Sequence, residues 1–495
     1  MDVPIAIYAP DQPPIGNFCR ALNNVLSETE LAYGPMLELQ TVTGALTARC
    51  QGFASFRATD GTVRTFAGDA TKLYRQTTTT WTDATRTVGG AYTITSENFW
   101  TFIVYGDLAI AVNGADAPQK FDITSATNFS ALAGTPPTAL HAAVWGNYVV
   151  LGNLSTANNK IQWSGTDDPE SWTVGVANSD ERTFPDSGKI VGLTGGRQKL
   201  VLLENAIWRA TEVGGTDIFQ LTEISTDRGC AASWSIAAYQ DLVFFLSRDG
   251  FFMLSDAGIL PIGEQLVDNT FWETVNKEQI HRVVATVEPE HKRYRVCYPS
   301  TESGDGTCDR MLVYNWATKR WTPSDAYSVE YIGRVKTATG LTLEDLNSPY
   351  PSLDAMTISL DSPAFASTDE EALSAFDTAH KLGFFDGSTL QATIPSPEAQ
   401  LISGAKAKII KVRPLVEAGD ADTTKIKTSL GVRKNKLNDV QQFTAEVSQR
   451  TRGHSPFATK RTKGRFHMAR TRIDAGTDWT AFQGWDFEAI PAGVR

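Results

Sequence analysis

Cysteine, histidine and long apolar runs are scarce in this chain of 495 residues, and each scarcity excludes a class of protein. The five cysteines are odd in number and scattered, with no CxxC pair, which favours a chain folded in a reducing compartment. Cys297 and Cys308 could face each other across a hairpin, but two ordinary buried thiols are the simpler expectation. No apolar run approaches the ~20 residues of a membrane span. The N-terminus lacks a basic region followed by a long apolar one, so no signal peptide is predicted.

The short motifs of catalysis and cofactor binding are also missing. The sequence contains no GxxxxGK[ST] loop, no GxGxxG opening a helix, no HExxH and no GxSxG. Its six histidines show no metal-ligand spacing. We therefore predict no catalytic, cofactor-binding or metal-binding residues, and expect that the protein is not an enzyme. A catalytic pair of carboxylates is the alternative, because loops from different repeats can bring distant acidic side chains together.

Positive charge is in deficit overall but concentrated in one segment. The formal net charge is −11, which argues against general affinity for DNA. Residues 401–472 nevertheless hold 17 Lys and Arg against 5 Asp and Glu, so the rest of the chain is strongly acidic. A basic segment on an acidic body suggests a partner surface at one end of the molecule. A solvated basic face without a partner is the alternative.

What the chain does have is a repeat, first visible in "IQWSGTDDPESWT" (161–173), an acidic loop between two tryptophans. Similar units begin with an apolar strand, a tight turn such as Gly-Asp or Gly-Asn, and a second strand. The first aromatic residues of four units stand at 74, 121, 163 and 208. A period of ~40–50 residues with several strands per unit is typical of a β-propeller blade.

The aromatic residues of the repeat are predicted to pack between neighbouring blades, because one blade alone cannot bury both of its faces. They are Tyr74, Trp81, Phe121, Phe129, Trp163, Trp172, Trp208, Phe219, Tyr314 and Trp321. Asp167, Asp168 and Pro169 are then expected to form a turn. A calcium loop or a sialidase-type Asp box is the alternative, but the adjacent aspartates, the following proline and the missing glycine match neither motif.

The chain is predicted to be mainly β, with a propeller-like repeat domain and an additional C-terminal antiparallel β-sandwich or sheet domain. The predicted boundaries are an irregular N-terminal segment with strands (1–64), propeller blades (65–335), an insertion with a short helix (336–381), a further blade-type hairpin (382–400) and a basic C-terminal β domain (401–495). The helix is expected in "STDEEALSAFDTAHK", which offers a Ser or Thr cap and acids in its first turn.

Several segments together resemble the tail nozzle proteins of short-tailed bacteriophages, also called packaged-DNA stabilisation or tail tubular B-like proteins. They are "NKIQWSGTDDPESW", "GDATKLYRQTTTTW", "GADAPQKFD", "HKLGFFDGSTL" and "ARTRIDAGTDWTAFQGWDFEAIPAGVR". The likeness covers most of 65–335 and 380–495, and the order and spacing of the segments carry it. It implies a propeller-bearing protomer in a homohexameric ring, attached below the portal and head–tail adaptor. The ring would continue the channel for double-stranded DNA, without sequence-specific binding, and retain the packaged genome until ejection.

The resemblance also implies a place in the virion tail after synthesis in the host bacterial cytoplasm, with tail fibre or spike proteins as further neighbours. It supplies no catalytic residues. The dense basic arm at 448–466 is predicted to face a protein partner rather than the channel, since a basic lining would hold the phosphates. Its residues are Arg450, Arg452, Lys460, Arg461, Lys463 and Arg465.

Two other functions stay open. The first is a tail-associated recognition module that binds host sugar or protein through its propeller loops. The second is a glycoside-cleaving propeller, for which an arginine cluster with Asp or Glu in one central cleft would be diagnostic.

Overall fold

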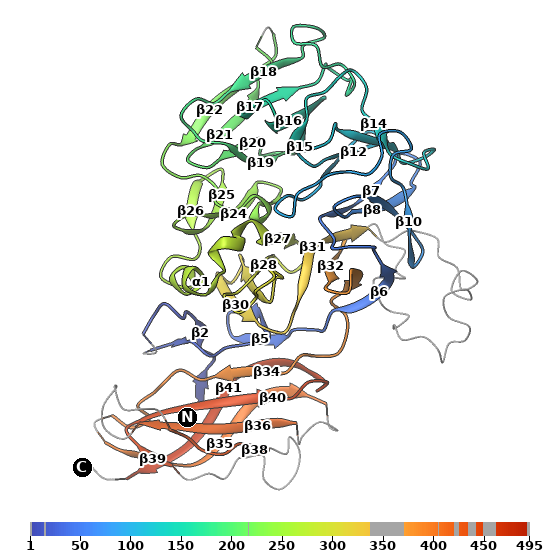
Figure 1. Cartoon of the computed structure of the whole chain (residues 1–495). Coiled ribbons are helices and arrows are strands. Elements are labelled where there is room, and N and C mark those ends of the chain that lie inside the picture. Colours follow the sequence, from blue (N-terminus) through green and yellow to red (C-terminus); the bar gives the residue numbers. More distant parts are fainter. Residues whose placement is uncertain are drawn as a thin grey trace, which may run out of the picture.

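The computed structural model describes residues 2–13, 16–215, 217–336, 371–403, 405–419, 425–433, 442–448 and 462–492. Strands dominate it, and the helical elements of these residues are α1 (Asp268–Thr274) and two short 3-10 helices, η1 (Ser233–Ser235) and η2 (Lys277–Arg282). The predicted fold class is confirmed: a propeller of antiparallel blades carries a sandwich-like β domain on one side (Figure 1).

Seven of the nine sheets that these residues form are blades of the propeller. In each of blades 1 to 5, four consecutive strands form one antiparallel meander. Blade 1 has β7 (Phe53–Arg57), β8 (Val63–Gly68), β9 (Leu73–Thr77) and β10 (Thr80–Asp83); blade 2 has β11 (Thr101–Tyr105), β12 (Leu108–Val112), β13 (Gln119–Asp122) and β14 (Ser130–Ala131); blade 3 has β15 (Ala139–Trp145), β16 (Tyr148–Leu154), β17 (Ala157–Trp163) and β18 (Asp180–Thr183); blade 4 has β19 (Ile190–Thr194), β20 (Leu200–Leu203), β21 (Ile207–Glu212) and β22 (Phe219–Ser225); blade 5 has β23 (Ala237–Tyr239), β24 (Leu242–Ser247), β25 (Gly250–Ser255) and β26 (Gly258–Pro261).

Blades 6 and 7 are completed by strands from the N-terminal part of the chain. Blade 6 has β27 (Val284–Glu288), β28 (Arg293–Tyr298), β29 (Arg310–Asn315) and β30 (Arg320–Ser324), followed by β2 (Ile7–Tyr8) and β3 (Phe18–Cys19); blade 7 has β31 (Val329–Lys336), β32 (Glu371–Asp377), β33 (Lys381–Phe384) and β6 (Gln40–Ala45). Strand β6 pairs antiparallel with β33, Thr41 opposite Gly383. The outermost strand of the last blade therefore comes from just before the first blade and closes the ring.

The turns of the repeat have the conformation that their sequences predict. Gly106 joins β11 to β12 and Gly146 joins β15 to β16 through two-residue loops, with φ of +57° and +59°. A positive φ at the first turn position matches the twist of the flanking strands and suits glycine, which has no Cβ.

Burial between blades explains why the blades stack into a ring. The described residues contain seven clusters of buried apolar side chains, one at each blade boundary, and the largest cluster also includes the core of the sandwich. Between blades 1 and 2, for example, the ring of Phe66 lies 4.8 Å from that of Phe121 and 5.3 Å from that of Phe129. A blade on its own would expose the apolar side chains on both of its faces to water, so stacking against two neighbours stabilises it.

The remaining two sheets face each other in the sandwich domain. The first contains β39 (Thr462–Gly464), β35 (Ala407–Ala418), β41 (Trp479–Pro491), β5 (Ala32–Pro35) and β4 (Val25–Thr29), with β1 (Asp2–Pro4) paired to β41; the second contains β34 (Ala392–Pro395), β40 (Phe466–Ile473), β36 (Ile426–Arg433), β37 (Gln442–Phe443) and β38 (Val447–Ser448). Ile409, Phe482 and Trp485 of the first sheet meet Leu430 and Ile473 of the second in their shared core.

The sandwich and the propeller share one core. Tyr33 of β5, Trp485 of β41, and Tyr294 and Trp321 of blade 6 belong to the same buried cluster. The N-terminal strands pass from the sandwich to blade 6, back to the sandwich and then to blade 7 (Figure 1). The two domains are therefore joined by packed side chains and by several crossings of the chain.

These crossings change the predicted boundaries. Blade 1 begins at β7, before the predicted residue 65. The segment ahead of it is not a separate N-terminal unit, because it supplies strands to blades 6 and 7 and to the sandwich. The predicted hairpin at 382–400 is wrong, because β33 belongs to blade 7 whereas β34 belongs to the sandwich. The sandwich therefore begins before residue 401 and includes strands from the first 35 residues.

The predicted short helix is wrong where the structure describes it, since residues 371–377 form strand β32. The rest of the predicted insertion, 337–370, lies outside the described residues. Strand β32 pairs with β31 on one side and β33 on the other. Its Phe376 is fully buried, with its ring 5.4 Å from that of Phe53. Cross-strand pairing and burial between blades thus override the local capping signal.

Candidate functional site

The aromatic residues that the repeat singles out lie at five blade boundaries. Tyr74 and Trp81 lie between blades 7 and 1, Phe121 and Phe129 between blades 1 and 2, Trp172 between blades 2 and 3, Trp163, Trp208 and Phe219 between blades 3 and 4, and Tyr314 and Trp321 between blades 5 and 6. Trp81 and Trp208 are partly exposed, and the others are buried. Sequence reasoning missed the residues at the other two boundaries, including Phe245 and Phe252 between blades 4 and 5. The apolar alternation of "DLVFFLSRDGFFML" contained that signal.

The acidic loop of the repeat lies between β17 and β18 of blade 3, and one ion pair joins it to blade 2. Asp167 has a φ of +55°, and Asp168 accepts a hydrogen bond from the Glu170 backbone N–H at 2.9 Å. The Glu170 carboxylate accepts from Lys120 of blade 2 at 2.5 Å, and this bond is the main cause of its lowered pKa. In the described part of the chain, no group of three or more His, Cys, Asp or Glu side chains is placed to hold a metal ion.

The propeller axis is filled by an axial plug, defined here as Phe99, His141, Trp234 and Tyr331. These side chains come from blades 2, 3, 5 and 7 or the loops leading into them. The Phe99 ring lies 5.3 Å from that of Trp234 and 5.4 Å from that of Tyr331, and the His141 ring lies 5.5 Å from that of Trp234. Burial lowers the pKa of His141 to about 3, so its imidazole is neutral at pH 7. Among the described residues, side chains from opposite blades are thus in contact across the axis.

A cationic group lies beside the plug. The Arg49 guanidinium lies 5.2 Å from the centre of the Phe99 ring, and its pKa is lowered to about 10 by burial and then by Arg282. The nearby Glu330 carboxylate accepts from the Cys50 backbone N–H and contacts the His380 ring nitrogen, both at 2.7 Å. An arginine and a carboxylate thus lie near each other close to the axis, which is the feature expected of a glycoside-cleaving propeller. Both oxygens of Glu330, however, are already bonded to groups of this chain.

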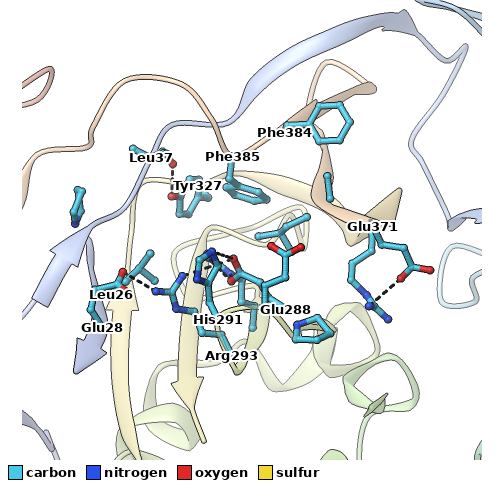
Figure 2. Close-up of a pocket in the computed structure, with 17 residues that line it drawn as sticks. Leu26, Glu28, Leu37, Glu288, His291, Arg293, Tyr327, Glu371, Phe384 and Phe385 are labelled. Atoms are coloured by element: carbon cyan, nitrogen blue, oxygen red, sulfur yellow. Dashed lines mark hydrogen bonds and ion pairs between the residues drawn. The ribbon is translucent and has the colours of Figure 1, made fainter. Parts of the chain in front are cut away.

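The close-up in Figure 2 shows a second polar site, which we call the domain-junction pocket. Its volume is about 340 Å³, and it lies among the N-terminal strands of the sandwich, the β27–β28 turn of blade 6 and strands of blade 7. Leu37, Tyr327, Phe384 and Phe385 form one side, and charged residues of blade 6 form the other (Figure 2).

The charged side of the pocket is a compensated ion network. Arg293 contacts Glu28 of β4 at 2.7 Å and Glu288 at 3.6 Å, while Arg295 contacts Glu288 at 2.8 Å. Both arginine side chains are only 4% exposed. Burial acts to raise the pKa of Glu288, but Arg295 and Arg293 together outweigh it and lower that pKa. His291 Nε2 stands 3.8 Å from Glu288, too far for a hydrogen bond. The network therefore joins a sandwich strand to blade 6.

Only part of the predicted basic interface can be placed. Lys463 and Arg465 are exposed, on and just after β39, whereas Arg450, Arg452, Lys460 and Arg461 lie outside the described residues. Lys463 lies directly opposite Lys408 of β35 at the edge of the first sandwich sheet. Like charges opposite each other on neighbouring strands repel, so this edge is electrostatically suited to an acidic partner.

The basic residues of the other sandwich sheet are largely paired within the domain. Arg472 contacts Glu446 at 2.6 Å, Arg433 contacts Glu398 at 2.9 Å, and Lys427 contacts Asp474. A count of charges along the sequence overstates the positive charge of this sheet, because these acids lie opposite the basic residues in space.

All five cysteines are free and buried. Burial raises the pKa of Cys297 to about 12. Cys308 lies in the same core between blades 6 and 7. No helix among the described residues is long and apolar enough to span a membrane.

Neither the known family models nor the curated proteins include a match to this chain. Solved structures with similar architecture include the extracellular domain of a one component system from B. thetaiotaomicron (8% identity, 77% of this chain, 44% of that chain, TM-score 0.42). They also include the Neurospora crassa Pan2 WD40 domain (7% identity, 70% and 96%, TM-score 0.40) and BamB from Moraxella catarrhalis (11% identity, 70% and 92%, TM-score 0.32). This chain spans less than half of the first of these.

Proposed function

We propose that this protein is a non-enzymatic structural component of the virion tail of a short-tailed bacteriophage. It forms a ring below the portal and adaptor, continues the DNA channel and retains the packaged genome until ejection. The observation that best supports this role is the axial plug. Because side chains fill the propeller axis, the propeller serves as a solid block, and a passage for DNA lies between copies of the chain rather than through one copy.

The joined domains support the same proposal. A ring that holds pressurised DNA needs protomers that keep their shape, and the shared core and the Arg293–Glu28 contact connect the sandwich to blade 6. A closed ring also needs two different surfaces of the protomer to meet. The Lys408–Lys463 edge and the acidic remainder of the chain provide surfaces of opposite charge, which steer and select such contacts.

The test is to prepare particles that lack this protein and measure the fraction of heads that keep full-length DNA. Mostly empty heads, with DNA free in the lysate, are the expected result. Full and stable heads that fail only at adsorption to the host would contradict genome retention and favour a recognition role. Native mass spectrometry of the purified protein, alone and with adaptor, tests ring formation separately.

A further inference from the structure

A cavity lies on the rim of the propeller, among β18, β21 and β22, on the side away from the sandwich (Figure 1). We call it the blade 3–4 cavity. Its volume is about 530 Å³, within the ~300–1,000 Å³ that ligand sites usually occupy. Residues after and on β18 form one wall, and β21 and β22 form the other. It lies where the core between blades 3 and 4 reaches the surface.

The cavity walls are aromatic and apolar. The rings of Phe184 and Trp208 lie 5.5 Å apart at 56°, so they meet as a corner rather than a closed stack. Leu221 and Val213 continue this wall, and Val213 is 52% exposed. An exposed apolar side chain next to an aromatic corner gives a ligand an apolar face to cover.

Trp208 differs from the other tryptophans of the repeat. The indole N–H groups of Trp81, Trp163, Trp172 and Trp321 each donate to an oxygen of this chain, at 2.6–3.1 Å. The indole nitrogen of Trp208 is buried and has no acceptor. Unlike those four N–H groups, the indole N–H of Trp208 is therefore not engaged by an acceptor of the described chain.

The rim of the cavity is polar, and the ion pair on it is largely exposed to solvent. Arg182 and Asp217 face each other from blades 3 and 4 at 3.7 Å, with 47% and 77% of their side chains exposed. An ion pair this open contributes little to stability. The two side chains nevertheless offer donors and acceptors at the mouth, with Gln220 beside them.

We propose that the blade 3–4 cavity binds a saccharide. A pyranose ring has an apolar C–H face that fits against Trp208 and Val213, and hydroxyl groups that both donate to Asp217 and accept from Arg182. A purely apolar ligand would leave the rim unused, and a small anion would leave the aromatic walls unused. Binding of sugar here adds a recognition function to the structural one and does not depend on it.

The test uses the full-length protein on a printed array of bacterial cell-surface oligosaccharides, followed by titration of the strongest binder by saturation-transfer NMR. Asp217→Asn and Arg182→Gln alter exposed side chains, so the protein should fold normally. Each should weaken binding about 10-fold, the usual effect of losing a hydrogen bond to a charged group. Trp208→Ala should abolish binding. Trp81→Ala is the matched control, because it removes another partly exposed indole at a different blade boundary and should leave sugar binding unchanged.

Three results would overturn the proposal: no oligosaccharide on the array bound, binding unchanged in Asp217→Asn and Trp208→Ala, or selection of peptides instead of sugars when a peptide array is probed in parallel. Genome retention by particles carrying Asp217→Asn should match the wild type. Failure of sugar binding and failure of the structural role are therefore measured separately.

Discussion

At the scale of single residues, the most consequential feature is the buried charge at the domain junction. Glu288 is the only described carboxylate that contacts both Arg293 and Arg295, and both arginines are almost inaccessible to water. Removing one member of such a network leaves buried charge uncompensated, which is more damaging than replacing the whole network by apolar groups. The network thus makes the stability of the junction sensitive to one residue.

Glu288→Gln should lower the free energy of unfolding by about 3 kcal/mol, because two buried guanidinium groups lose their shared counter-charge. Urea unfolding at pH 7 measures this change. Glu290→Gln, an exposed position two residues along the same turn, is the control and should change stability by less than ~0.5 kcal/mol. Equal stability of wild type and Glu288→Gln would show that the network is neutral.

The lowered pKa of Glu288 also sets a pH dependence. Its ordinary value is 4.5, and the folded value lies below this. The stabilisation is therefore complete above about pH 4.5 and is lost as the pH falls through the folded pKa, since the unfolded state takes up the proton first. Unfolding curves between pH 7 and pH 3 should show the difference between wild type and Glu288→Gln shrinking as the pH falls. A difference that grew with acid would contradict this assignment.

A glycine at the boundary of blades 2 and 3 gives a second test. Gly134 has a φ of +77°, and a Cβ there would stand 1.6 Å from the Glu170 backbone oxygen. Gly134→Ala should therefore destabilise the protein by at least ~2 kcal/mol, through backbone strain and a clash with backbone. Gly196→Ala is the control, because Gly196 has a similar φ of +73° but open space around it. It should show the strain alone, about 1 kcal/mol, in thermal unfolding. Equal destabilisation by Gly134→Ala and Gly196→Ala would mean that the backbone near Glu170 moves and relieves the clash.

At the scale of elements, the ring depends on the seam between blades 7 and 1. Strand β6 completes blade 7 without following it in the sequence, so pairing with β33 and packing across the boundary hold it there. Every other boundary joins blades that are consecutive in the chain. The seam is therefore the place where the ring should open first.

Phe376→Ala should cost about 3–5 kcal/mol and open this seam, because the buried ring contacts blade 1 through Phe53. Hydrogen exchange should show faster exchange of the amides in β6 and β33. Phe121→Ala removes an equally buried ring between blades 1 and 2 and should cost a similar free energy. Phe121→Ala should leave the amides of β6 as protected from hydrogen exchange as those of the strands beside it. Uniform loss of protection in both variants would mean that the seam is no weaker than other boundaries.

At the scale of the whole molecule, assembly is expected to depend on the edge of the sandwich. Lys463→Glu together with Arg465→Glu should reduce ring formation, because the edge would then repel an acidic partner. Within the sheet, the carboxylate introduced by Lys463→Glu would lie opposite Lys408 and replace a repulsive pair by an attractive one. The monomer should therefore stay folded, and analytical ultracentrifugation can assign any loss to assembly.

Arg197→Glu is the control for this change of charge, since Arg197 is 73% exposed on blade 4, away from the sandwich. It should assemble as the wild type does. Undiminished rings in the double variant would show that this edge faces solvent. Weaker assembly of the wild type as salt increases would support an electrostatic contact, because exposed charges are screened.

The sequence by itself determined the class of fold and the repeat. Alternating apolar residues, two-residue turns and aromatic residues at a ~40–50-residue period predict propeller blades, because each is a local pattern that sheet geometry requires. The burial of Trp163, Trp172 and Phe121 follows from the same patterns.

Only the tertiary structure decided which distant segments meet. The pairing of β6 with β33, the strand at 371–377 and the shared core of sandwich and propeller join residues far apart in the chain. The Arg293–Glu28 contact, the axial plug and the free indole N–H of Trp208 likewise depend on neighbours from other elements. Local propensity carries no information about such neighbours, because their stabilisation appears only when water is excluded between packed surfaces.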